Sequence, residues 1–175
     1  MIRAAAASRY PGAMRIPLCA AALSLCVTAC GSGDLDAAGD YTVTVTDGQN
    51  GCNLPSWTPG AMSNATVTLT QSGNNVTAVV TGLGGAVLDI GLGSHSFTGK
   101  INGSTLALDL FGTRSNNSGN CTYTINAKIH AVLDGDALSG QIDYTSATNG
   151  NPDCGGIAGC DSFQDIAGTR AKPAA

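Results

Sequence analysis

Apolar and polar residues alternate with a period of two through most of the chain after residue 40. In residues 41–46 a tyrosine and two valines alternate with threonines, and the run 121–134 repeats the pattern over a longer stretch. Successive side chains of a β-strand point to opposite faces, so these runs predict strands with one buried and one solvated face. The predicted strands span 40–47, 63–71, 75–81, 86–91, 95–102, 105–112, 121–134, 137–146 and 160–170.

Glycine beside small polar residues separates several of these runs. The segments 72–76, 102–106 and 134–138 each place a glycine next to asparagine, serine or aspartate. Asn-Gly and Asp-Gly supply the positive φ that tight hairpin turns require, so the strands are expected to pair as antiparallel hairpins. Asp134-Gly135-Asp136 is explained by such a turn, and no ladder of calcium ligands follows it.

The pattern predicts an all-β fold, an antiparallel meander of about eight strands closed as a small up-and-down barrel. A two-layer β-sandwich is the alternative. No helical pattern of ten residues interrupts the strands, so the glycine-rich segment 82–93 is expected to form strand connections. In outline the domain resembles the small lipocalin-like barrels and the threonine-rich lipoprotein domains of bacterial envelopes. It departs from true lipocalins because Trp57 lies in a loop rather than in an opening glycine-x-tryptophan motif.

The first thirty residues have the pattern of an export signal. An apolar run, 16–29, follows three arginines, and no acidic residue precedes it. This is a positive n-region and an h-region too short to be a permanent membrane span. The run ends in Val27-Thr28-Ala29-Cys30, which resembles the lipobox of bacterial lipoproteins. The resemblance implies cleavage before Cys30 and acylation of its thiol, whereas an ordinary secretory signal or a buried helix would leave Cys30 unmodified.

Four parts of the chain are therefore expected: a signal peptide at 1–29, a lipidated flexible tether at 30–39, a single β domain at 40–170 and a tail at 171–175. Both Met1 and Met14 are candidate start residues, because Met14 precedes an arginine and would begin a more usual signal. Gly31 stands where an aspartate marks inner-membrane retention in many lipoproteins. The resemblance thus implies a protein anchored in the bacterial cell envelope, at the outer membrane.

Charge narrows the range of partners. Twelve aspartates stand against five basic residues after Ala29, so this part of the chain has a net charge of about −7. Such a balance repels nucleic acid and anionic headgroups. We therefore expect contact with the membrane through the N-terminal lipid anchor alone, and no nucleic-acid partner.

The cysteines after Cys30 predict a disulfide framework. They are Cys52, Cys121, Cys154 and Cys160, an even number, which in an exported protein indicates two disulfides. Of the three possible pairings, the sequence favours Cys154 with Cys160, which closes the shortest loop, and Cys52 with Cys121. A metal site is the weaker interpretation because no C-x₂-C spacing is present.

Candidate catalytic chemistry is sparse. His95 and His130 stand outside any G-x-S-x-G or HExxH frame and are interpreted as exposed strand residues. No helix is expected to follow the glycines of 82–93, so a phosphate loop is not predicted. A carboxylate pair of the glycosidase type stays open, because distances across strands cannot be read from sequence. We therefore assign no catalytic residue, no metal ligand and no cofactor.

Two aromatic residues are candidates for contact with a ligand. Trp57 lies between Pro55 and Pro59 in a loop, where it either caps the barrel or lines a mouth on which a ligand stacks. Tyr123 lies on the predicted inward face of the strand 121–134.

Three functions are compatible with these observations. The first is a lipid-anchored envelope lipoprotein whose non-catalytic β domain binds an envelope protein or has a surface or structural role. The second is a carrier of a small apolar ligand inside a lipocalin-like barrel, for which the inward alanines would leave room: Ala65, Ala127 and Ala131. The third is a hydrolase with a site on loops. A cavity of roughly several hundred Å³ would favour the carrier.

Overall fold

The strands lie side by side in nearly the order in which they occur in the chain. In the computed structural model, which describes residues 35–172, the elements are β1 (Gly39–Asn50), β2 (Met62–Ser72), β3 (Asn75–Thr81), α1 (Gly82–Gly91), β4 (Ser96–Asn102), β5 (Thr105–Leu110), β6 (Asn116–Ser118), β7 (Cys121–Asp134), β8 (Ala137–Thr148), a 3₁₀ turn (Pro152–Cys154) and β9 (Asp161–Arg170). The sheet order is β5-β4-β3-β2-β1-β9-β8-β7-β6, with every pair antiparallel.

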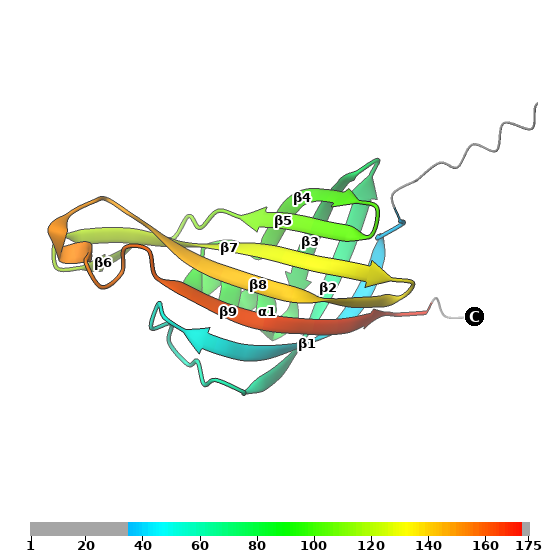
Figure 1. The fold of residues 1–175 in the computed structure, drawn as a ribbon, viewed down its shortest axis with the longest axis horizontal. Helices are drawn as coiled ribbons and strands as arrows, with labels where there is room; N and C mark the ends of the chain where they lie inside the picture. The colour runs from blue at the N-terminus through cyan, green and yellow to red at the C-terminus, as the bar shows by residue number, and fades with distance from the viewer. Residues whose placement is uncertain (1–34, 173–175) are drawn as a thin grey trace, which may run out of the picture. The chain divides into compact units, whose positions relative to one another are not determined.

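One further pairing closes this sheet into a barrel of eight strands (Figure 1). β5 pairs with β7 from Thr105 opposite Val132 to Leu110 opposite Ala127. The short β6 pairs only with the start of β7, and Figure 1 shows it beside the outer ends of β7 and β8, away from the closed part of the barrel. The predicted all-β meander barrel is confirmed, and the sandwich alternative is not adopted.

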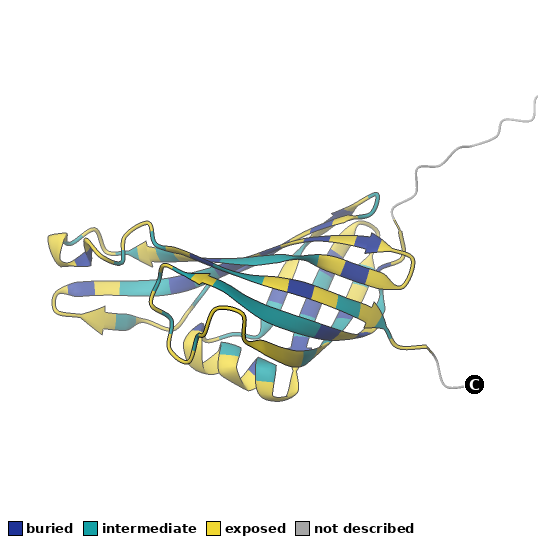
Figure 2. Cartoon of the chain, turned by 60° about the horizontal axis from the view of Figure 1, so that its bottom comes forward, coloured by how far each residue is buried: buried dark blue, intermediate teal, exposed yellow. Residues whose placement is uncertain are grey.

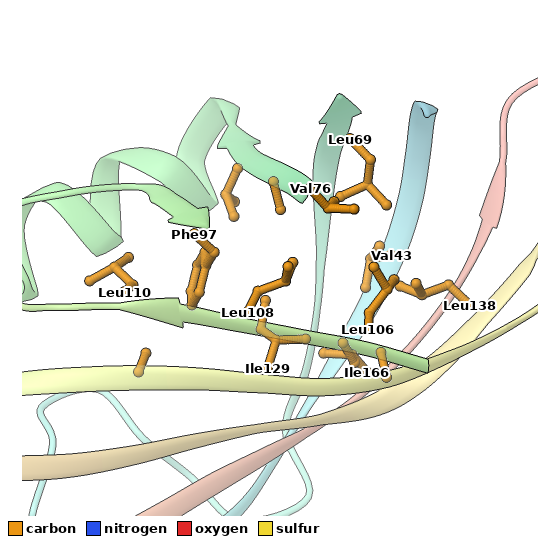
Figure 3. Close-up of a cluster of buried hydrophobic side chains, with 14 of the residues drawn as sticks. Val43, Leu69, Val76, Phe97, Leu106, Leu108, Leu110, Ile129, Leu138 and Ile166 are labelled. Atoms are coloured by element: carbon orange, nitrogen blue, oxygen red, sulfur yellow. The ribbon is translucent and has the colours of Figure 1, made fainter. Parts of the chain in front are cut away.

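The inward side chains follow the predicted alternation. On β7 every second residue from Ile125 onwards is buried, namely Ile125, Ala127, Ile129, Ala131 and Leu133, while Lys128 and His130 are exposed. The same pattern on β5 buries its three leucines, and Figure 3 shows them meeting side chains from the strands opposite. A single apolar core inside the barrel therefore positions all eight strands.

The segment before β1 covers one end of the barrel. Ala37 is fully buried, and its N–H donates to Gln71 Oε1 at 2.7 Å. The N–H of Leu35 donates to the carbonyl of Gly103 in the β4–β5 turn at 3.0 Å, and Arg170 donates to the carbonyl of Asp36. Residues 35–38 of the expected tether thus belong to the folded domain, and residues 30–34 lie outside the described part of the chain.

The disulfide pairing differs from the prediction. All four expected cysteines are bridged, but Cys52 pairs with Cys160 and Cys121 with Cys154. β1 and β9 are neighbours in the sheet, and the Gly51 N–H donates to the Asp161 carbonyl at 3.0 Å, which brings Cys52 to Cys160. The prediction relied on the short separation of Cys154 and Cys160 in the sequence. Which thiols meet is set instead by which strands are neighbours in the sheet.

The segment 82–91 is a helix, α1, and the predicted strand 86–91 is wrong. Three of its first four residues are glycines, each of which costs about 1 kcal/mol relative to alanine in a helix, so the sequence conceals it. Packing explains the choice: a Cβ on Gly85 would lie 2.4 Å from the Val80 carbonyl oxygen. The helix ends at Gly91, and Gly93, which follows the C-cap residue Leu92, has a φ of +85° that suits glycine. Within residues 35–172 no helix is long and apolar enough to span a membrane.

Replacing Gly85 by alanine is expected to destabilise the fold by about 1–3 kcal/mol, because the new methyl group must push α1 away from β3. Gly91→Ala is the matched control, since a Cβ there meets nothing within 4 Å and alanine favours the helix by about 1 kcal/mol. Urea unfolding of both variants measures the difference. Equal losses in both would contradict the packing explanation.

Candidate ligand-binding cavity

A cavity of about 820 Å³ extends from the interior of the barrel to an open mouth. Its walls are inward side chains from β1, β2, β3, β5, β7, β8 and β9, and its rim is formed by α1 and the loop between β1 and β2. Drug-sized ligands occupy pockets of roughly 300–1,000 Å³ that are lined mainly by apolar groups. Most of the lining residues here are apolar, so the cavity has the size and character of a site for a small apolar molecule.

Small side chains account for part of this space. Ala65, Ala78 and Ala131 line the cavity, and Ala78 and Ala131 are almost completely buried. Ala131 lies on β7 next to the exposed Val132, so the two side chains lie on the inner and outer faces of the same strand. Two of the three alanines expected to leave room, Ala65 and Ala131, therefore do line a cavity; Ala127 is buried but lies outside its lining.

α1 supplies one side of the rim. Leu83, Val87 and Ile90 line the cavity, yet their exposed fractions are 87%, 67% and 67%. These residues are spaced by four and three positions and so lie on one face of the helix. Figure 2 shows α1 as largely exposed at the edge of the barrel. A group that is both solvent-exposed and part of the cavity wall marks the mouth, which is therefore apolar on this side.

The β1–β2 loop supplies another part of the rim and contains Trp57. The indole Nε1–H donates to the carbonyl of Gly48 at 3.0 Å. The indole ring packs edge-on against Tyr144, with ring centroids 5.6 Å apart and an interplanar angle of 89°. Asn50 fixes the base of the loop by accepting from the Leu54 N–H and donating to the Leu54 carbonyl. Trp57 is thus held at the cavity by its hydrogen bond and by the tyrosine.

A chain of polar groups lies on the cavity wall below this loop. The Tyr144 hydroxyl donates to Gln164 Oε1 at 2.7 Å, and Gln164 Nε2 donates to Asp47 Oδ1 at 2.7 Å. The Thr58 N–H donates to Asp47 Oδ2 at 3.1 Å. Burial raises the pKa of Tyr144 well above its ordinary value, and the nearby Asp47 carboxylate adds to the shift. Tyr144 is therefore a neutral hydrogen-bond donor, and the Asp47 carboxylate carries the negative charge of this hydrogen-bonded group of side chains.

The structure separates the two aromatic candidates. Trp57 lines the cavity, whereas Tyr123 is half-buried against the core and does not line it. Cys30 lies outside the described residues. His130 is exposed on β7, as expected. The polar cavity-lining residues that sequence reasoning missed are Asp47, Tyr144 and Gln164. Asp47 continues the inward alternation of Tyr41, Val43 and Val45, and that signal could have identified it.

His95 has a partner that the sequence did not predict. Its Nδ1 lies 2.8 Å from Asp89 Oδ1 on α1, beside a separate hollow of about 350 Å³. Both side chains are nearly half exposed. Within residues 35–172, no hydroxyl or thiol side chain is hydrogen-bonded to the other ring nitrogen of His95, and no three carboxylate, histidine or cysteine side chains gather as metal ligands. The pair joins α1 to the segment before β4.

Comparisons of this chain with protein-family models, curated proteins and solved structures find no match.

Proposed function

We propose that this protein is a non-catalytic binding protein that carries a small apolar ligand inside its barrel. The observation that supports this proposal is the 820 Å³ cavity with an apolar wall and an exposed apolar rim. A purely structural barrel gains stability by filling its interior, because cavities reduce the free energy of unfolding. Room of this size inside a closed barrel favours ligand binding over a surface or structural role.

The cavity can be filled without touching its mouth. Ala131→Phe is expected to weaken binding of a neutral apolar dye at least tenfold, about 1.4 kcal/mol, because the added ring occupies the ligand volume. Val132→Phe is the matched control: its side chain lies on the outer face of β7, 46% exposed, and should leave the affinity unchanged. Fluorescence titration with Nile red measures both. No dye binding by the wild type, or equal losses in both variants, would reject the proposal.

The proposal also includes export to the bacterial cell envelope and a lipid anchor on Cys30, at the outer membrane. The two disulfides are typical of an exported protein. The lipid anchor itself is supported by the resemblance of Val27-Thr28-Ala29-Cys30 to a lipobox. Anchoring at the envelope would place the cavity close to a source of apolar molecules.

Intact mass spectrometry of protein purified from a bacterial envelope tests the anchor. The wild-type chain should begin at Cys30 and carry acyl chains, whose combined burial makes anchoring effectively permanent. The Cys30→Ala variant should lose this added mass and leave the membrane fraction. An unacylated wild-type chain would remove the anchor from the proposal and leave ligand binding to be judged on its own.

A further inference from the structure

The polar part of the cavity has a definite charge, which bears on the ligand beyond its apolar character. Asp47 is the single carboxylate among the residues that line the cavity, and no lysine, arginine or histidine is among them. The other polar lining residues are uncharged: Ser56, Ser63 and Asn64 are exposed, and Tyr41 and Trp57 have their polar atoms in hydrogen bonds with groups outside the lining. The cavity therefore presents a net negative charge to its ligand.

The hydrogen bonds that link Tyr144, Gln164 and Asp47 leave mostly acceptor positions free for a ligand. The Tyr144 hydroxyl uses its proton on Gln164, so it offers only a lone pair. Each carboxylate oxygen of Asp47 accepts one bond, and an ionised carboxylate has about four acceptor positions. Among these three side chains, one N–H of Gln164 is the only donor that their hydrogen bonds leave unused. A ligand group placed here must chiefly donate.

Resting on the proposed function, we infer that the cavity selects apolar molecules that end in a protonated amine, with the ammonium bound by the Asp47 carboxylate. An ammonium carries donors only and a positive charge, so it matches both the free acceptors and the sign of the site. A hydroxyl end can donate one bond but gains no charge attraction. A carboxylate end has only acceptors, has no cation to meet in the cavity and is repelled by Asp47.

Three dodecyl compounds that differ only in their polar end test this inference: dodecylamine, dodecanol and dodecanoate. Each is titrated at neutral pH, below its aggregation threshold, against protein loaded with Nile red. Trp57, the one tryptophan of the chain, lies on the cavity wall and gives a second, site-specific fluorescence signal. The expected order of affinity is amine, then alcohol, then carboxylate. The amine should exceed the alcohol by about tenfold, because only the ammonium adds charge attraction to its hydrogen bond with Asp47.

Two charge-neutralising variants locate the preference. Asp47→Asn removes the carboxylate and should lower the affinity for dodecylamine about tenfold while changing that for dodecanol little. Asp165→Asn is the matched control, because Asp165 is exposed on β9 next to Gln164 and lies outside the cavity lining. It removes the same charge from the protein as a whole, so it should leave the preference for the amine intact. Circular dichroism of both variants shows whether the barrel is retained.

The outcomes separate the inference from the proposed function. If dodecanoate binds as tightly as dodecylamine, or if Asp165→Asn removes the amine preference as fully as Asp47→Asn, the inference is wrong and the carrier proposal stands. If none of the three compounds displaces Nile red or changes the Trp57 signal, the carrier proposal and the inference fall together. The ranking on the wild-type protein decides the matter even if Asp47→Asn does not fold.

Discussion

Replacing Cys52 and Cys160 together by alanine is expected to lower the free energy of unfolding by about 4–5 kcal/mol, the largest single effect foreseen for this protein. The bridge joins residues separated by 108 positions in the chain. A crosslink that closes a loop of about 100 residues restricts the unfolded chain by about 4.7 kcal/mol in the chain-entropy model. Urea unfolding of the oxidised variant beside the wild type measures the loss as a shift of the midpoint.

The same variant tests the pairing itself. With Cys52 and Cys160 removed, the Cys121–Cys154 bridge should persist, and thiol alkylation with peptide mapping of residues 35–172 should find no free thiol. A Cys52→Ala and Cys121→Ala variant is the comparison, because it breaks both bridges and should leave Cys154 and Cys160 free. If Cys121 and Cys154 are free in the first variant, and Cys154 and Cys160 are bridged in the second, then Cys52 pairs with Cys121. A stability loss below about 1 kcal/mol would contradict the crosslink argument.

Phe97→Ala is expected to cost about 3–5 kcal/mol, the second largest effect. Phe97 lies on β4, is completely buried, and packs inside the barrel with the leucines of β5 (Figure 3). Truncation removes the transfer free energy of the ring and leaves a void that the closed barrel cannot collapse around. Thermal or urea unfolding measures the loss, and the reduced stability should appear without any change in secondary structure at low temperature.

Phe111 provides the matched control for this truncation. It is a phenylalanine with 75% of its surface exposed, just after β5, and Phe111→Ala should change the stability by no more than about 0.5 kcal/mol. Neither phenylalanine lines the ligand cavity, so the affinity for Nile red should be retained by both folded variants. A similar loss for both phenylalanines would contradict the assignment of Phe97 to the core.

The proposed ligand binding and the stability of the fold make different demands on the same barrel. Phe97 and Leu110 fill part of the interior and lie outside the cavity lining, whereas Ala78 and Ala131 leave space in it. The space is open towards α1 and the loop that contains Trp57, and the other end of the barrel is covered by Ala37. The described part of the chain thus combines packed positions and open space within one barrel interior that has an apolar mouth.

The sequence by itself determined most of the strands and their antiparallel pairing as hairpins, and it favoured the barrel over the sandwich. Period-two alternation decides which side chains face inward, and Asn-Gly and Asp-Gly turns decide that neighbouring strands form hairpins, so both depend on local chemistry. The same alternation marked Ala65 and Ala131 as inward-facing. The four bridged cysteines were also predictable as a set, because an even number of cysteines in an exported chain is a compositional signal.

Only the tertiary structure decided which cysteines pair, where the helix lies and which polar groups meet. Cys52 finds Cys160 because β1 and β9 are adjacent when the barrel closes, although 108 positions separate them. α1 forms although its glycines disfavour a helix, because they allow close contact with β3. Helix propensities of single residues do not include such a tertiary contact. Asp47, Gln164 and Tyr144 lie on three strands, and the closed barrel alone brings them to one wall of the cavity.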